Sequence, residues 1–262
     1  MPRGPGERPE IFSVSQVTTY LSCPRKYRFR YLDRREPEHR SADLALGSAV
    51  HSAIEWYQVE RIAGVEPELS SVLRIFRCDW HSQGALGDLT FDEDEKPEDL
   101  NQLGRELVRL FVERFRDEPP PSAVEERFEV FVRHPKTGAL LPVPLVGYFD
   151  LVGPGYVGEM KTTARRSPVS AWSLQLSAYS HAQRRLTGER PTMRVIQLVK
   201  TKVPKVEVEE LVVSEQEENW FVEVAVEVYA AITAGAFPPS PSWMCGRCEY
   251  RRACGRPGAS PS

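Results

Sequence analysis

Hydrophobic residues in the first 120 positions recur at intervals of three and four, which is the spacing of amphipathic helices. Within residues 42–63, for example, Leu46, Val50 and Ile54 fall on one helix face. Ser15 is a candidate cap for the first helix, and Pro24 suits the first turn of the second. Helices are predicted over residues 15–22, 24–32, 42–63, 67–82 and 98–117.

The spacing changes to two after residue 120, where Phe128, Val130 and Val132 alternate with charged residues and so predict a strand. Residues 134–138 are predicted to form a hairpin turn. Ser214 and Glu217 have the spacing of a capping box at the start of the last helix. Further strands are predicted over residues 143–152, 155–162, 193–201 and 206–213, and further helices over residues 170–187 and 214–234. This order predicts an α/β fold with a mixed central sheet flanked by helices.

The composition is ordinary for a soluble globular protein: 41% of the 262 residues are hydrophobic and 27% are charged. No apolar run approaches the roughly 18 residues that a membrane span needs. The first ten residues, MPRGPGERPE, lack the apolar stretch of a secretory signal. We therefore expect a cytoplasmic protein with no membrane partner.

Charge is unevenly distributed along the chain. The net charge is −3, which taken alone argues against a nucleic-acid partner. Residues 88–99, however, carry seven carboxylates and one lysine, so the rest of the chain has a net charge of +3. Basic residues cluster within residues 25–35, 165–166, 184–185, 200–205 and 247–256. Each cluster alone is most simply a solvated surface, whereas several around one site would favour a groove that follows a phosphate backbone.

Four of the five cysteines are divided between the two ends of the chain. Cys23 stands alone near the N-terminus, and Cys245, Cys248 and Cys254 form a C-x2-C-x5-C motif near the C-terminus. In a reducing compartment, such a set is more typical of a metal site than of disulfides. Four thiolates suit one tetrahedral zinc ion or one 4Fe–4S cluster, and either would close a loop of more than 200 residues.

Five other residues are expected to have structural or surface positions rather than a role in chemistry. Cys78 lies within a predicted helix and is expected to be a buried, inert thiol. Trp243 and Tyr250 flank the C-terminal cysteines and are expected to shield them. Glu125 and Glu126 could add a carboxylate to a nearby site, but solvent exposure at a strand edge is the simpler expectation.

Ionisable residues lie on two consecutive predicted strands. Glu159 and Lys161 are two residues apart and so share a face, whereas Met160 between them points into the core. Adjacent strands would bring Asp150 beside Glu159, where two carboxylates repel each other unless a cation lies between them. Oxygen ligands favour Mg²⁺ or Mn²⁺, and such an ion beside a lysine suits phosphodiester hydrolysis. A lone Glu-x-Lys pair is a common surface feature, so further motifs are needed.

Two further motifs make the pattern resemble the PD-(D/E)XK nucleases, and in particular their RecB-like branch. The matching segments are, in chain order, LGSAVH (46–51), GYFD (147–150), GEMK (158–161) and QLSAY (175–179). The resemblance implies a restriction-endonuclease-like core. The residues that it implies are His51, Asp150, Glu159 and the Met160 carbonyl as ligands of Mg²⁺ or Mn²⁺; Asp150, Glu159 and Lys161 as catalytic residues; and Gln175 and Tyr179 as DNA-binding residues on one helix face.

The cysteines resemble those of the iron–sulfur members of that branch, such as CRISPR-associated exonucleases and the AddB nuclease domain. In these proteins one upstream cysteine joins a C-terminal C-x2-C-x5-C motif around a 4Fe–4S cluster; on chemistry alone, Zn²⁺ stays an alternative. The resemblance implies one nuclease domain over residues 12–256, with iron–sulfur-binding segments at 12–35 and 238–256 and a helical insertion with an acidic loop at 64–118. Disordered tails are expected at 1–11 and 257–262.

The resulting hypothesis is a metal-dependent DNA nuclease, most simply a single-strand exonuclease, acting in DNA repair and recombination or in CRISPR spacer acquisition. Its partners would be DNA that is single-stranded or has single-stranded ends, and a CRISPR integrase or a helicase subunit. One alternative is a non-catalytic or weakly catalytic subunit that binds DNA ends in such a complex. Another is a zinc-stabilised adaptor in which the carboxylates are incidental.

Overall fold

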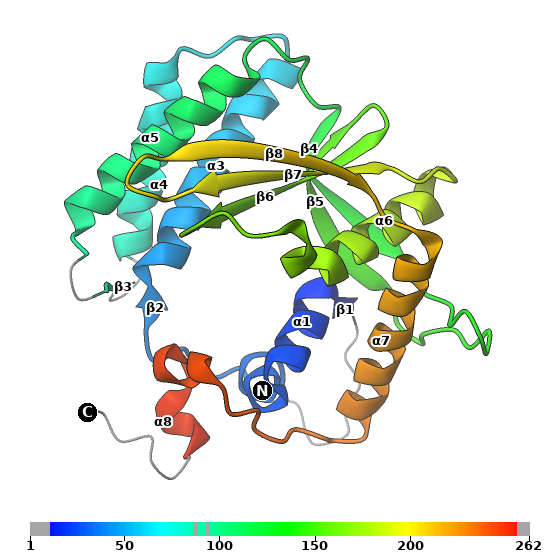
Figure 1. The fold of residues 1–262 in the computed structure, drawn as a ribbon. Helices are drawn as coiled ribbons and strands as arrows, with labels where there is room; N and C mark the ends of the chain where they lie inside the picture. The colour runs from blue at the N-terminus through cyan, green and yellow to red at the C-terminus, as the bar shows by residue number, and fades with distance from the viewer. Residues whose placement is uncertain (1–10, 86–88, 93–94, 256–262) are drawn as a thin grey trace.

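A six-stranded mixed sheet forms the centre of the computed structural model, which describes residues 11–85, 89–92 and 95–255 (Figure 1). The strands are β1 (Phe12–Ser13), β4 (Ala123–Val130), β5 (Leu145–Gly153), β6 (Tyr156–Thr163), β7 (Thr192–Val199) and β8 (Lys205–Val212). They lie in the order β1-β5-β6-β7-β8, and β4 pairs with β5. The β6–β7 pair is parallel, whereas β4–β5, β5–β6 and β7–β8 are antiparallel. The predicted mixed sheet is confirmed.

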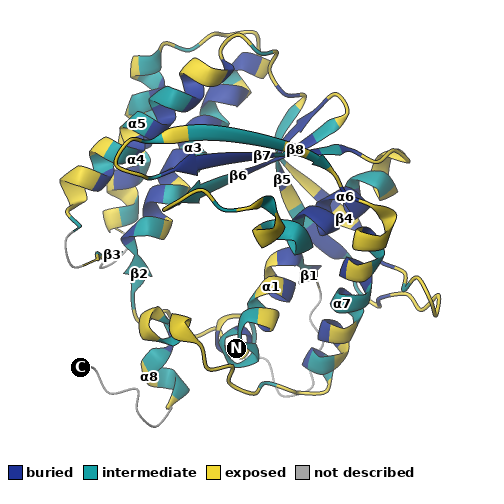
Figure 2. Cartoon of the chain, in the orientation of Figure 1, coloured by how far each residue is buried: buried dark blue, intermediate teal, exposed yellow. Residues whose placement is uncertain are grey.

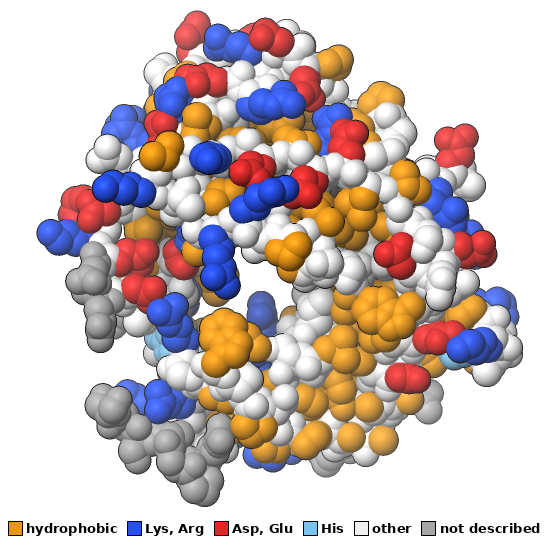
Figure 3. All heavy atoms as spheres, in the orientation of Figure 1, with side chains coloured by type: hydrophobic (Ala, Val, Ile, Leu, Met, Phe, Trp, Pro, Cys, Tyr) orange, Lys and Arg blue, Asp and Glu red, His pale blue; other side chains and the backbone are white. Residues whose placement is uncertain are grey.

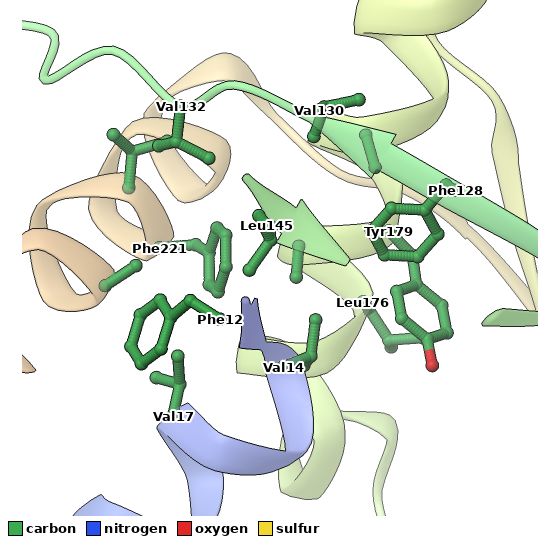
Figure 4. Close-up of a cluster of buried hydrophobic side chains, with 14 of the residues drawn as sticks. Phe12, Val14, Val17, Phe128, Val130, Val132, Leu145, Leu176, Tyr179 and Phe221 are labelled. Carbon is green, nitrogen blue, oxygen red and sulfur yellow. The ribbon is translucent and has the colours of Figure 1, made fainter. Parts of the chain in front are cut away.

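Helices cover both faces of this sheet (Figures 1 and 2). The helices of one face are α3 (Ala42–Ile62), α4 (Leu69–Ala85) and α5 (Pro97–Phe115); those of the other are α1 (Val14–Ser22), α6 (Ser173–Thr187) and α7 (Glu215–Thr233). Each face has its own buried hydrophobic cluster. In the cluster beneath α1, α6 and α7, Phe12, Leu145 and Phe221 lie close together (Figure 4). Burying each such side chain contributes about 1.5–3 kcal/mol.

Most of the predicted elements are present, and the differences have local causes. The capping box of α7 is confirmed, because the Ser214 hydroxyl accepts from the Glu217 N–H at 3.3 Å and the Glu217 carboxylate accepts from the Ser214 N–H at 2.8 Å. The prediction of Ser15 as the cap of α1 is wrong. Ser13 takes that position and accepts from the Gln16 N–H at 3.2 Å. The strand containing Phe128 begins earlier than its hydrophobic alternation, at Ala123.

Short strands are among the elements that the hydrophobic pattern did not predict. β1 pairs with β5 in parallel, and β2 (Arg40–Ser41) pairs with β3 (Leu89–Thr90). Two-residue strands are too short to produce a period. β3 lies in the acidic segment that was expected to be a loop, of which residues 88, 93 and 94 lie outside the described residues. The predicted disordered tails also lie outside them, apart from residue 11.

The C-terminal segment returns to the N-terminal helices (Figure 1). It comprises η3 (Trp243–Arg247) and α8 (Arg251–Cys254), and it meets α2 (Pro24–Tyr27), which continues into η1 (Arg28–Leu32). The Tyr20 hydroxyl donates to the Ala236 carbonyl at 2.6 Å, and the Lys26 ammonium pairs with Glu249 at 2.9 Å. The Glu38 carboxylate accepts from two backbone N–H groups of α8. Segments more than 200 residues apart are therefore held side by side.

Across the described ranges, none of the helices combines the length and the apolar character that crossing a bilayer would require.

A buried ionic cluster joins α6 to α7. Glu218 is fully buried, and its carboxylate accepts from the Ser180 hydroxyl at 2.7 Å, from Arg184 at 2.7 Å and from Arg190 at 3.1 Å. Beside this cluster lies His181, which is 7% exposed. Among the described residues, neither ring nitrogen of His181 has a hydrogen-bond partner. Burial lowers the pKa of His181 to about 4 against the opposing effect of the Glu218 charge, so the ring is neutral at pH 7.

We expect His181 to make the fold acid-sensitive. Its folded pKa lies below the unfolded value of about 6.5, so the unfolded chain binds the extra proton and stability falls as the pH drops from about 6.5 towards 4. Between pH 7.5 and pH 5 this loss amounts to about 2 kcal/mol. Urea unfolding at the two pH values should show that His181→Phe loses about 2 kcal/mol less than wild type. The exposed control His81→Gln should behave as wild type, and equal losses in all three proteins would contradict the prediction.

Candidate active site

The candidate site begins where β5 and β6 separate. Their antiparallel ladder runs from the Gly153–Tyr156 pair to the Leu151–Gly158 pair and then stops. Asp150 and Glu159 are the next residues along the two strands. Instead of a ladder bond, the Asp150 carboxylate accepts from the Met160 N–H at 2.6 Å. The expectation that adjacent strands bring Asp150 beside Glu159 is therefore confirmed.

Glu159 and Lys161 face the same side of β6, as their spacing predicts. The Lys161 Nζ lies 2.5 Å from Glu159 Oε1, and the Glu159 side chain is almost fully buried. Met160 points the other way, into the hydrophobic cluster beneath α3. Burial and the charge of Asp150 raise the pKa of Glu159 to about 8, although Lys161 and a hydrogen bond from Gln175 oppose this. Strand periodicity thus separates one side chain that packs from two that can do chemistry.

Gln175 links the lysine, the glutamate and a tyrosine in one network. Its Oε1 accepts from Lys161 Nζ at 2.9 Å, and its Nε2 donates to Glu159 Oε1 at 2.9 Å. The same Nε2 lies 3.0 Å from the Tyr179 hydroxyl, one turn further along α6. The Tyr179 ring packs edge-on against Phe128 and Phe149. Burial raises the pKa of Tyr179, so the hydroxyl stays protonated. The network fixes the position of Lys161 before any substrate binds.

His51 enters the site from α3, on the opposite face of the sheet. Burial lowers its pKa, and the charge of Asp150 raises it less strongly, so the imidazole is neutral and has a nitrogen lone pair available. Gly47 lies one turn earlier, where α3 passes the end of β6. A Cβ atom at Gly47 would lie 3.8 Å from the Thr162 Cβ, which is ordinary contact. The structure therefore tolerates alanine at Gly47, and the motif glycine is not required for internal packing.

The burial of Glu125, a residue near the site, differs from the sequence-based expectation. The expectation of solvent exposure is wrong: the side chain is half-buried, with the charge of Asp150 close by. Burial, Asp150 and Glu55 together raise its pKa to about 7. Glu55 lies one turn beyond His51 on α3. Glu126, in contrast, is exposed as expected. A carboxylate in a predicted strand gives no signal of its own, so only the strand register could have identified Glu125.

The donor chemistry of this site fits a hard divalent cation, although the side chains form no ready-made cage. Among the described residues, no three His, Cys, Asp or Glu side chains are arranged to hold a metal ion. Glu159 Oε2 is nevertheless buried without a hydrogen-bond partner in that part of the chain. Burial also raises the pKa of Asp150. Neighbouring carboxylates that repel each other, one of them with an oxygen that lacks a partner, are what Mg²⁺ or Mn²⁺ would satisfy.

The four cysteines from the two chain ends line one cavity of about 300 Å³ (lined also by Arg25 and Lys26). All are free thiols. The Ser240 N–H points at Cys23 Sγ at 3.5 Å, and the Ser242 N–H points at Cys245 Sγ at 3.4 Å. N–H groups directed at sulfur suit a thiolate-bound centre. The donor set fits iron or zinc, with no three of the described cysteines already at ligand spacing.

Two further expectations, one for Cys78 and one for Trp243, are wrong. Cys78 is exposed on α4 rather than buried, because it lies on the face of that helix that turns away from α3 and α5. Trp243 is 86% exposed and shields nothing within the described chain, whereas Tyr250 is buried and packs against Phe29 with ring centroids 5.8 Å apart. Tyr250 alone therefore has the shielding position that was predicted for both.

Several residues of the basic clusters pair with acidic residues. Figure 3 shows blue and red side chains intermixed over α5 and β8 rather than one positive surface. Arg166 pairs with Glu207 at 2.7 Å and with Glu209 at 3.0 Å. Arg247 of the cysteine segment pairs with Asp92 of the acidic segment at 3.2 Å. These pairs support the simpler interpretation, a solvated surface with charges of both signs, around Arg166 and Arg247.

Comparison with known proteins identifies a family. The sequence profile of the PD-(D/E)XK nuclease superfamily matches residues 11–255. A candidate exonuclease from Eubacterium rectale has a similar structure, with a TM-score of 0.60 and 15% sequence identity over 97% of this chain and 91% of that protein. The structure of SSO0001 aligns over 97% of this chain and 90% of its own, with 14% identity and a TM-score of 0.46. A search of curated proteins found no match.

Proposed function

Because the chain belongs to the PD-(D/E)XK nuclease superfamily, we propose that it is a Mg²⁺- or Mn²⁺-dependent deoxyribonuclease of the RecB-like branch. The observation that carries the proposal is the cluster in which Asp150, Glu159 and Lys161 meet at the point where β5 and β6 separate. The structural similarity to a candidate exonuclease supports digestion from an end. We propose single-stranded DNA as the substrate.

Each residue of the cluster has a role that follows from its position. His51, Asp150, Glu159 and the Met160 carbonyl would hold the cation. When bound, the cation supplies charge that polarises a phosphodiester and lowers the pKa of water. Lys161 is held by Gln175, so its ammonium can donate to a phosphate oxygen or to the attacking water without first being ordered. Tyr179, held against the core, fixes Gln175 in turn, and this helix face would meet the DNA.

The cysteine cavity supports a second part of the proposal, a structural 4Fe–4S cluster held by Cys23, Cys245, Cys248 and Cys254. Support comes from the convergence of both chain ends on one cavity and from the N–H groups directed at two of the sulfur atoms. Zinc would satisfy the same donors. Analysis of iron, sulfide and zinc in anaerobically purified protein decides between the two. Zinc without iron or sulfide would contradict the 4Fe–4S cluster and identify a zinc site instead.

Cleavage of end-labelled DNA tests the nuclease. Linear single-stranded, linear double-stranded and circular single-stranded DNA are each incubated with the protein and Mg²⁺, Mn²⁺ or EDTA. We expect metal-dependent release of nucleotides from linear single strands, with circular DNA resistant. Because circular DNA has no ends, its cleavage would show that the protein acts as an endonuclease and not as an exonuclease. If folded, metal-loaded protein cut none of these three DNA substrates, the result would contradict the proposed nuclease activity and favour a subunit that only binds DNA ends.

A further inference from the structure

The register of the sheet places a third carboxylate in line with the two already described. The β4–β5 ladder pairs Val124 with Leu151 and Glu126 with Phe149, so Glu125 falls opposite Asp150. On the other side of β5, the register places Asp150 opposite Glu159. Glu125, Asp150 and Glu159 therefore form a row across three neighbouring strands. Like charges placed opposite one another on adjacent strands destabilise a sheet.

The backbone is also distorted at Glu125. Its φ is +48°, in the left-handed region that favours glycine, and Arg34 is the one other described non-glycine residue with a positive φ. Among the residues of the described strands, Glu125 is therefore the one with a positive φ. Such a conformation costs about 1–2 kcal/mol and persists where the surroundings require it. The Glu125–Asp150 pair is missing from an otherwise regular ladder, so the distortion occurs at the position that faces the site.

No group in the described part of the chain compensates the Glu125 charge. Its carboxylate has no hydrogen bond or ion pair there, and the charges that reach it are those of Asp150 and Glu55, both negative. Lys161 is engaged by Glu159 and Gln175. A second observation points to a missing positive charge, because the almost fully buried Glu159 leaves Oε2 without a hydrogen-bond partner among the described residues, and the charge of Asp150 acts on the same carboxylate.

We propose that Glu125 is a third carboxylate of the cation site and holds the divalent ion together with Asp150 and Glu159. The inference rests on the proposed function, since it assigns a further residue to the same site. It explains in one step why a glutamate occupies a left-handed position, why it faces Asp150 and why its charge has no counterpart. A purely structural role would instead give the carboxylate a partner within the protein.

Binding of Mn²⁺ to DNA-free protein tests the inference, measured by electron paramagnetic resonance or by calorimetry. Glu125→Gln keeps the shape and removes the charge, and Glu126→Gln makes the same change one residue away on an exposed side chain. We expect Glu125→Gln to weaken Mn²⁺ binding at least about 10-fold, and Glu126→Gln to bind as wild type. Glu125→Gly, which suits the positive φ, should weaken binding equally while melting no lower than wild type.

The outcomes separate this inference from the nuclease itself. Equal Mn²⁺ affinity in wild type and Glu125→Gln overturns the inference while leaving any measured cleavage intact. A different result would support the inference and contradict the proposed function: Glu125→Gln and Glu125→Gly bind Mn²⁺ more weakly than wild type, yet the wild type cuts no DNA. Absence of Mn²⁺ binding to folded wild-type protein overturns both.

Discussion

Asp150→Asn is expected to lower DNA cleavage at least about 10³-fold and to leave the metal-free fold at least as stable as wild type. The carboxylate lies beside Glu159 and opposite Glu125, and burial raises its pKa, so its charge is unfavourable in the absence of a cation. An asparagine oxygen can still accept from the Met160 N–H, so the splayed end of β5 keeps its one side-chain bond. Function should therefore be lost without a loss of structure.

Single-turnover cleavage and thermal melting measure the two effects. Mn²⁺ should raise the melting temperature of wild type and not that of Asp150→Asn, because a ligand stabilises only the state that binds it. Asp117→Asn, an exposed acid just beyond α5, should match wild type in every assay. If Asp150→Asn cleaved DNA at a rate within a few-fold of wild type, Asp150 would be neither a metal ligand nor a catalytic residue.

Lys161→Met provides a contrast within the same cluster. It should also abolish cleavage, yet bind Mn²⁺ at least as tightly as wild type, because the lysine is a positive charge 2.5 Å from Glu159 rather than a cation ligand. Loss of Mn²⁺ binding in this variant would mean that Lys161 organises the site rather than acting on the substrate.

Residues whose positions follow from strand or helix periodicity could be placed from the sequence. Glu159 and Lys161 share a face because they are two apart on a strand, and Gln175 and Tyr179 share a face because they are four apart on a helix. Asp150 joined them because consecutive apolar strands commonly pair. Each step used local spacing together with one assumption of adjacency, and the structure satisfies that assumption.

What the sequence did not reveal depends on register and backbone conformation. Glu125 belongs to the row of carboxylates only because β4 pairs with β5 in one register, and the positive φ of a glutamate has no sequence signature. Cys78 is expected inside because it lies within a predicted helix and free cysteines are typically buried, but the side of α4 that is buried depends on how α3 and α5 pack. Such features arise from long-range pairing, which hydrophobic periodicity does not encode.

Cys23→Ala is expected to reduce the bound metal and to lower the melting temperature by about 10 °C or more. A metal centre held by Cys23 and the C-terminal cysteines closes a loop of more than 200 residues, and a cross-link of that length is worth about 5 kcal/mol in the chain-entropy model. The hydrogen bonds between the two segments, such as that from Tyr20 to Ala236, would have to hold the C-terminal segment alone. Melting and metal analysis of anaerobically purified protein measure the effect.

The size of this loss distinguishes a metal staple from ordinary packing. Without a bound metal, Cys23→Ala removes one long contact from the Ser240 N–H to sulfur, at 3.5 Å, which is worth at most about 1 kcal/mol. Wild type stripped of metal should therefore melt close to Cys23→Ala, whereas loaded wild type should melt far above both. Cys78→Ala, on the exposed face of α4, should keep its metal and its melting temperature. If Cys23→Ala kept both as well, Cys23 would not be a ligand of the metal, and packing rather than a metal staple would hold the two chain ends together.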